Sequence, residues 1–346
     1  MIRANGSAPY AGRCRFIGTV LPQGDEMTLQ QIKYALTVAR AGSMNQAAER
    51  LFITQPSLSA AIHELERELG RPIFYRRGRG VVVTQEGEDF LAQARQVYQQ
   101  YELLLEKYGP EGGSKRKFGV SMQHYSFAVK AFVETVKRFD TLHYEFAIRE
   151  TRTLDVIKDV GDLRSEVGIL YRSAFNQKII DKMLSGHDLE FVPLIECCAY
   201  VYLWKDHPLA KEASISMEQL KEYPCLSFEQ GDEGSLYFAE EILSEVEHPR
   251  IIKSNDRATQ LNLMVGLNGY TLCSGIICEE LNGGDYIAVP FREDKENRNT
   301  VMEIGYIVKR NSMRSNIASV YIEEIKRYLE KAGSQTGMTK PSAPSI

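Results

Sequence analysis

Residues 41–59 read AGSMNQAAERLFITQPSLS, and this stretch decides the fold of the N-terminal part of the chain. An apolar helical pattern in the residues before it stops at Gly42. Ser43 can cap a second, short helix, because its side chain can accept a hydrogen bond from a free backbone N–H of the first turn. Ala47 and Ala48 are small enough to let that helix pack closely against its neighbours.

The second half of the stretch predicts a third helix with a polar N-terminal end. Thr54 can cap this helix, and Pro56 fits its first turn, where the missing N–H of proline costs nothing. In a helix-turn-helix, short polar side chains at this end enter the DNA major groove and read bases or contact phosphates. A generic helical bundle with a polar exposed face is the alternative. The polar residues at this end are Thr54, Gln55, Ser57 and Ser59.

Residues 27–85 differ in charge from the chain as a whole. The 346-residue chain has a formal net charge of −4, whereas this part holds eight basic and four acidic residues, which leaves +4. Two β-prone segments, 72–76 and 81–84, predict a hairpin whose tip, residues 77–80, is basic and rich in glycine. A basic region in an acidic chain indicates a polyanionic partner for that region.

A long uninterrupted helix is predicted next, from about Gln85 to Tyr108. Its apolar residues recur at spacings of 4, 3, 4, 3 and 4, the heptad seam of a coiled coil. So narrow a stripe on so long a helix needs a partner helix, and the segment therefore predicts dimerisation. The seam residues are Phe90, Ala94, Val97, Tyr101, Leu104 and Tyr108.

The rest of the chain predicts a hinge, an α/β domain and a tail. Residues 109–116 bear glycine and proline, as hinges do. Over 117–331, short apolar strands alternate with helices, which is typical of an α/β domain. The polar segment 332–346 predicts a disordered tail. For residues 1–26 two readings stay open: an extension upstream of a true start at Met27, or a disordered segment.

The pattern from residue 41 onward resembles the N-terminal domain of LysR-type transcriptional regulators. The resemblance implies a multidomain fold: a winged helix-turn-helix over 27–85, all-α with a β-wing, then a coiled-coil linker helix over 86–108 that makes a dimer. A C-terminal two-lobed α/β domain like the periplasmic binding proteins follows, and tetramers are common in the family. The matching residues run in one order through Ala41-Gly42-Ser43, Ala47-Ala48-Glu49-Arg50-Leu51 and Thr54-Gln55-Pro56-Ser57-Leu58-Ser59, and continue to Gly87.

This resemblance implies a DNA-contacting set in the first domain. Its members are Ser43, Thr54, Gln55, Pro56, Ser57, Ser59, Arg76, Arg77 and Arg79. The sequence departs from the family at four positions that are often basic or polar there, and that here are Ala60, Ala61, His63 and Glu64. The departure weakens phosphate contacts from the third helix and shifts them to the arginines of the wing.

The same resemblance implies an effector site between two lobes, the first over 117–195 and 291–331, the second over 196–290. Ligands of such folds bind at strand ends and helix N-termini, where free N–H groups attract anions. Each candidate could instead be a polar loop residue that only caps a helix. Residues 121–125 with 256–259 are similar to a Gram-positive branch of the family, some of it linked to sulfur amino-acid supply. The candidates for a small polar or anionic effector are Ser121, Met122, Gln123, His124, Thr151, Ser227, Phe228 and Asn255.

Together these features predict a cytoplasmic, DNA-binding transcription regulator and not an enzyme. The sequence has no Gly-x-Ser-x-Gly, P-loop or His-Glu-x-x-His motif, no apolar run long enough to span a bilayer, and six cysteines without a disulfide or metal spacing. No cofactor or metal is expected. The expected partners are double-stranded promoter DNA, a small-molecule effector, further copies of this chain as a dimer or tetramer, and RNA polymerase. The alternative, a solute-binding protein with an accessory helical domain, would require export and leave residues 27–108 without a purpose.

Overall fold

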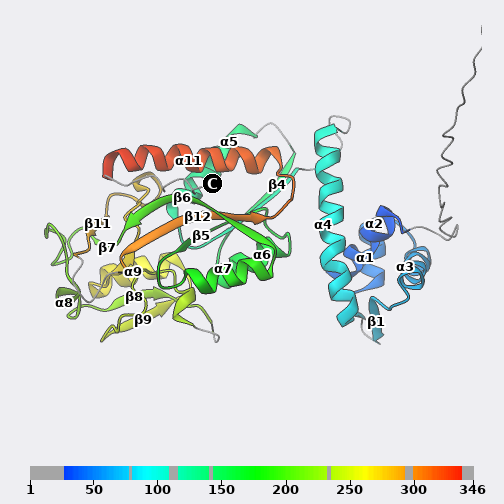
Figure 1. Ribbon diagram of the computed structural model, residues 1–346, viewed down its shortest axis with the longest axis horizontal. Coiled ribbons are helices and arrows are strands. Elements are labelled where there is room, and N and C mark those ends of the chain that lie inside the picture. Colours follow the sequence, from blue (N-terminus) through cyan, green and yellow to red (C-terminus); the bar gives the residue numbers. More distant parts are fainter. Residues whose placement is uncertain are drawn as a thin grey trace, which may run out of the picture. The chain divides into compact units, whose positions relative to one another are not determined.

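The computed structural model describes residues 27–77, 80–108, 116–139, 143–231, 235–292 and 299–336. These residues form two compact units that meet in sequence between Ala94 and Arg95 (Figure 1). The predictions for residues 1–26, for Arg79, for the hinge up to residue 115 and for the tail from residue 337 lie outside the described residues. So do the side chains of Arg76 and Arg77.

Three short helices form most of the first unit, and the predicted caps set their ends. The Thr54 hydroxyl accepts a hydrogen bond from the N–H of Ser57, and Gly42 ends the first helix in the left-handed conformation, with φ at 62°. Ser43 stands at the predicted cap of the second helix, but its side chain makes no capping hydrogen bond. The helices are α1 (Leu29–Ala41), α2 (Met44–Leu51) and α3 (Gln55–Leu69).

The core of this unit follows from the apolar stripes of its helices. Leu58, Ile62 and Leu65 lie on one face of α3 at helical spacing, and all are buried. Ala47 is buried completely, so its small side chain brings α2 close to the other helices. Each large side chain buried in this way contributes about 1.5 to 3 kcal/mol of hydrophobic stabilisation.

The predicted wing is an antiparallel hairpin of β1 (Phe74–Arg77) and β2 (Gly80–Val83). The Glu66 carboxylate of α3 accepts hydrogen bonds from the N–H groups of Ile73 and Phe74, at 2.8 and 3.0 Å. The N–H of Val81 donates to the carbonyl of Gly42 at 2.9 Å. The hairpin is therefore fixed to α3 at one end and to the turn between α1 and α2 at the other.

Helix α4 (Gln85–Tyr108) has the predicted length, but the first part of its predicted seam packs within its own unit. Phe90 packs against the helix-turn-helix core, in which Leu91 is fully buried, and Ala94 is only 3% exposed. Further along the seam, Val97, Leu104 and Tyr108 are 51%, 46% and 73% exposed, while Tyr101 is half-buried. The exposed apolar side chains of the predicted seam therefore begin at Val97 and not at Phe90.

The second unit contains a five-stranded sheet in the order β4-β3-β5-β12-β6. The strands β3, β4 and β5 are parallel, and β12 runs antiparallel to β5 and β6. The strands are β3 (Arg116–Met122), β4 (Tyr144–Glu150), β5 (Val167–Arg172), β6 (Leu189–Cys198) and β12 (Val301–Lys309). Four helices cover the sheet: α5 (Ser126–Arg138), α6 (Thr153–Gly161), α7 (Gln177–Gly186) and α11 (Asn316–Thr336).

Both faces of this sheet are covered, as a continuous apolar strand such as β5 requires. Ile169 and Tyr171 belong to the core that includes Phe127 of α5 and Tyr321 of α11. Leu170, which points to the other face, packs with residues of α6 and α7. In Figure 1, α5 and α11 accordingly lie on one side of the sheet and α6 and α7 on the other. We call this layer arrangement lobe I.

Lobe II is built from smaller sheets. Strands β7 (Tyr200–Trp204), β10 (Thr271–Cys273) and β11 (Tyr286–Pro290) form one antiparallel sheet, and β8 (Cys225–Phe228) and β9 (Ile251–Ser254) form a parallel pair. Its helices are α8 (Met217–Leu220), α9 (Arg257–Leu267) and α10 (Glu279–Asn282), with a single 3-10 turn at Leu236–Phe238. None of the helices in the described part of the chain combines the length and apolar content that crossing a bilayer requires.

Two predicted boundaries are wrong. Lobe I extends past residue 195, because Cys197 and Cys198 still pair with Met302 and Val301 of β12. Helix α11 extends to Thr336, beyond the predicted start of the tail at residue 332. The glycine in its last turns does not end it, since one glycine weakens a helix by only about 1 kcal/mol.

Candidate DNA-binding face and ligand pocket

The N-terminal end of α3 brings most of the predicted DNA-contacting residues together. Thr54, Pro56 and Ser57 are exposed there, and Gln55 and Ser59 are half-buried. The hydroxyls of Thr54 and Ser57 lie 2.8 Å apart, so the cap also fixes the position of a second polar side chain. Ser43 stands apart from this cluster, at the start of α2.

The charge of α3 decides where phosphate contacts can come from. The helix contains three Glu residues and one Arg, and that one, Arg67, forms an ion pair with Glu64. Its N-terminal turn offers few backbone N–H groups, because Pro56 has none and that of Ser57 donates to Thr54. The helix dipole still adds partial positive charge there. Side-chain cations for the DNA backbone must therefore come from outside α3.

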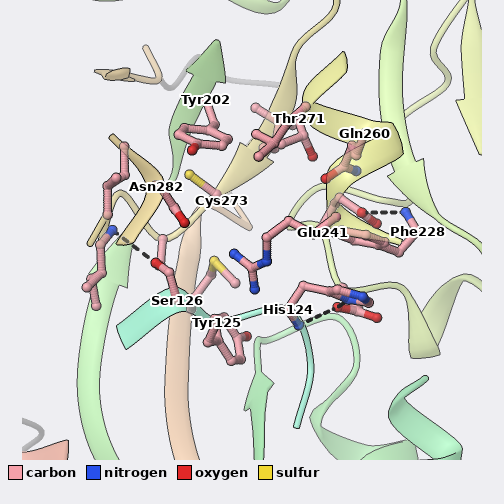
Figure 2. Close-up of a pocket in the computed structure, with 18 residues that line it drawn as sticks. His124, Tyr125, Ser126, Tyr202, Phe228, Glu241, Gln260, Thr271, Cys273 and Asn282 are labelled. Carbon is pink, nitrogen blue, oxygen red and sulfur yellow. Dashed lines mark hydrogen bonds and ion pairs between the residues drawn. The ribbon is translucent and has the colours of Figure 1, made fainter. Parts of the chain in front are cut away.

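A cavity of about 90 Å³ lies between the two lobes of the second unit. Figure 2 shows Tyr202, Thr271, Gln260, Glu241, His124 and Tyr125 arranged around it. Of the eight predicted effector residues, two, His124 and Phe228, line this cavity. The other six do not.

Ser121 and Met122 point into lobe I. The Ser121 hydroxyl donates to the Asp159 carboxylate at 2.5 Å and lies 2.8 Å from the hydroxyl of Ser165. Met122 is fully buried in the core between the sheet and α5. The sequence places both residues at the end of a strand, but their side chains serve the lobe's own packing.

The side chain of Gln123 also makes its hydrogen bonds with residues of lobe I. Its amide nitrogen donates to Thr153 Oγ1 at 2.6 Å. Its amide oxygen accepts from the N–H of Tyr171 and the hydroxyl of Tyr125, at 3.1 and 3.0 Å. With these partners Gln123 positions the start of α5 and does not face the cavity.

The remaining three candidates, Thr151, Ser227 and Asn255, also lie outside the cavity lining. The N–H of Thr151 donates to the carbonyl of Met122 at 2.9 Å. Ser227 is buried in β8, and Asn255 is exposed before α9. None of the three lines the cavity.

His124 is held by lobe II on two sides. Its ring stacks on Phe228, with the ring centroids 3.6 Å apart and the planes 3° from parallel. Its backbone N–H donates to Glu240 Oε2 at 2.9 Å, and its Nδ1 lies 2.8 Å from the same oxygen. A carboxylate of the protein itself therefore occupies the N–H position at which the sequence predicted an anionic ligand.

Glu241 places a second carboxylate in the cavity wall. It is 6% exposed, and its Oε1 accepts a hydrogen bond from the N–H of Phe228 at 2.8 Å. Burial, and then the neighbouring Glu240, raise the pKa of Glu241 to about 8. The side chain of Tyr171 supports this segment by donating to the Glu241 carbonyl at 3.0 Å.

Helix α9 contributes two further side chains that the sequence analysis missed as site residues. Arg257 lines the cavity and forms an ion pair with Glu150 of lobe I. Gln260 lies three residues further on the same helix face, is 4% exposed, and its amide nitrogen has no hydrogen-bond partner. The helical spacing could have indicated these two together, whereas nothing in the sequence marks Glu240 and Glu241 as buried.

The described residues contain no group of three His, Cys, Asp or Glu side chains that could hold a metal ion. What the cavity offers is a set of hydrogen-bonding and charged groups from both lobes. Such a site binds and orients a small polar molecule.

Two family models match the chain. The one described as "Bacterial regulatory helix-turn-helix protein, lysR family" matches residues 29–88, and the "LysR substrate binding domain" matches residues 124–330.

Named relatives agree with these matches. The chain is 26% identical over 222 residues to the HTH-type transcriptional activator CmpR of Synechocystis, over 63% of this chain and 68% of that protein. It is 27% identical over 271 residues to the Hca operon transcriptional activator HcaR of Escherichia coli, over 76% and 87%.

A full-length OxyR variant from Pseudomonas aeruginosa has the same fold, with a TM-score of 0.63 at 20% identity, over 92% of this chain and 100% of that one. Because the substrate-binding match alone covers more than half of the sequence, the chain belongs to the LysR family of bacterial regulatory proteins.

Proposed function

We propose that this LysR-type DNA-binding transcriptional regulator reads its operator with the N-terminal end of α3 and responds to a small molecule bound between lobes I and II. One observation carries the proposal: the same chain joins a helix-turn-helix with exposed Thr54 and Ser57 to a two-lobed domain whose cavity is lined by charged, polar and apolar side chains. The relatives reported above are transcriptional activators, not enzymes.

The wing arginines supply affinity in this proposal, and α3 supplies discrimination. Since α3 has more acidic than basic side chains, we assign the neutralisation of phosphates to Arg76, Arg77 and Arg79 of the wing. Gln55 and Ser57 stand where base edges would be read. The chain acts in the cytoplasm as a dimer or tetramer through α4, and it contacts RNA polymerase at the promoter.

Replacing Gln55 with alanine should weaken binding to the cognate site by about 1 to 3 kcal/mol and leave binding to random DNA nearly unchanged. The reason is that a base-reading amide contributes only where its base is present. Fluorescence anisotropy titrations, with a site selected from random-sequence DNA, measure both affinities.

Gln177→Ala, which removes an exposed glutamine from α7 in the other unit, is the matched control and should change neither affinity. An equal loss on both DNAs for Gln55→Ala would show that this residue does not read sequence. If the wild-type chain binds no DNA at all, the solute-binding alternative becomes the better account.

The ligand would act by changing the geometry of the two lobes and thereby of the assembled DNA-binding units. Footprint titrations with and without metabolite extract test this half of the proposal. We expect the extract to alter the footprint of the wild-type protein. An unchanged footprint would contradict the proposed effector response but would not affect the proposed DNA-binding role.

A further inference from the structure

The structure assigns a ligand class to the interlobe cavity. We propose that its ligand is a small zwitterion of the amino-acid type, whose ammonium group lies against Glu240 and Glu241 and whose carboxylate is bound by Gln260 and Arg257. The inference rests on the proposed function, because it takes the same cavity as the effector site.

The two carboxylates provide the first argument. Glu240 and Glu241 are 9% and 6% exposed. Glu240 is engaged by His124 and by the Gln230 amide at 3.2 Å, but Glu241 meets backbone donors, and within the described residues no Lys or Arg forms an ion pair with it. A buried carboxylate without a counter-charge is costly, and its pKa of about 8 reflects that cost. A ligand ammonium group would supply the missing charge.

Gln260 provides the second argument, independent of charge. Its amide nitrogen is buried in the cavity wall and has no acceptor. A buried donor left unpaired lowers stability, and a ligand oxygen that accepted its hydrogen bond would remove that cost. Within one turn of it, Arg257 presents a guanidinium whose five N–H donors exceed what its pair with Glu150 can use. This end of α9 therefore suits a carboxylate.

The two arguments together exclude simpler ligands. A purely anionic molecule could reach Gln260 and Arg257 but would leave Glu241 without a counter-charge. A simple amine would leave Gln260 unpaired. A molecule that carries both groups satisfies both ends, and a cavity of about 90 Å³ limits it to a small one.

Thermal unfolding of the full-length chain with each standard L-amino acid, at about 10 mM, tests the class directly, because a binder raises Tm by mass action. For any amino acid that stabilises, the 2-hydroxy acid and the amine of the same carbon skeleton are the matched probes. We expect each probe to bind at least about tenfold more weakly, a difference of about 1.4 kcal/mol.

Three results would overturn the proposal: no stabilisation by any amino acid, equal binding of the hydroxy acid, or equal binding of the amine. Equal binding of the hydroxy acid would show that Glu240 and Glu241 do not bind an ammonium group. Equal binding of the amine would show that Gln260 and Arg257 do not bind a carboxylate. A footprint that responds to metabolite extract while no amino acid binds would leave the proposed function standing. A chain that binds an amino acid but no DNA would support the ligand class and contradict the proposed DNA-binding function.

Two variants locate the ligand. Glu241→Gln and Gln260→Leu should each lower the affinity for the amino acid at least tenfold, whereas Gln177→Leu on α7 should not. Gln260→Leu should also raise the Tm of the ligand-free chain, since it removes an unpaired donor, and this separates lost binding from a failure to fold. Calorimetry near pH 7 should detect proton release on binding to the wild type and none with Glu241→Gln. Unchanged affinity in both variants would place the ligand elsewhere.

Discussion

The variant Glu241→Gln is expected to make the ligand-free protein markedly more stable at alkaline pH. It should lose less stability than the wild type as pH rises. The pKa of Glu241 is about 8 in the folded chain, against an ordinary value of 4.5. Between these values the unfolded chain has released the proton that the folded chain still holds. Stability from this group is therefore complete below about pH 4.5 and is lost as pH rises through about 8.

The size of the effect follows from the same linkage. One group in this situation costs about 1.4 kcal/mol for each pH unit. Over the interval from 4.5 to about 8, the total loss is on the order of 5 kcal/mol for a carboxyl that stays buried. Glutamine keeps the shape and the acceptor for the Phe228 N–H without ionising. Urea unfolding at about pH 5, 7 and 9 should give a small difference in the free energy of unfolding at the lowest pH and several kcal/mol at the highest.

Glu218→Gln serves as the control, because this carboxylate of α8 is 80% exposed and should show no such pH-dependent gain. If the free energies of unfolding of the wild type and Glu241→Gln stay parallel across this pH range, Glu241 ionises at its ordinary pH. The argument for a missing cation in the cavity would then fail with it.

The helix-turn-helix could be predicted from sequence because its signals are local. Thr54 caps a helix within three residues of itself, and Gly42 takes a left-handed conformation that side chains disfavour. The stripe of Leu58, Ile62 and Leu65 needs only helical spacing to be recognised. Local chemistry and the tertiary fold agree in this unit.

The cavity could be predicted only in outline, because which strand-end residues face it depends on contacts far apart in sequence. Ser121 follows the expected strand but turns to Asp159, 38 positions along the chain. Glu240 and Glu241 look like solvated charges in the sequence, and only their contacts with His124 and Phe228 reveal them as buried. Polar type and strand position therefore indicated only two of the side chains that line the cavity, His124 and Phe228.

The prediction of a dimer seam along the whole of α4 was wrong in part, for a related reason. A heptad spacing identifies an apolar stripe but not what covers it. Phe90 and Ala94 satisfy the spacing, yet Phe90 packs against its own helix-turn-helix core and Ala94 is buried within the single chain. The seam is exposed in the single chain only from Val97 onward.

Changing Val97 and Leu104 together to lysine should dissociate the assembly that we propose through α4. These side chains are 51% and 46% exposed within one chain, and with Tyr108 they form one apolar stripe. A charge placed in an apolar interface without a partner costs several kcal/mol, and a symmetric dimer would contain each substitution twice. Light scattering should report a fall from the mass of the oligomer to that of a single chain.

The control for this variant adds the same charge away from the seam. Gln96→Lys with Glu102→Gln also raises the net charge by two, but on other faces of α4. It should leave the oligomer mass unchanged, which separates interface loss from general charge repulsion. Phe90 is left intact because it packs against the core of the DNA-binding unit, and Ala94 because it is buried within the single chain. An unchanged mass for the double lysine variant would mean that the chain assembles through another surface, and that the exposed stripe on α4 does not hold the two DNA-binding units together.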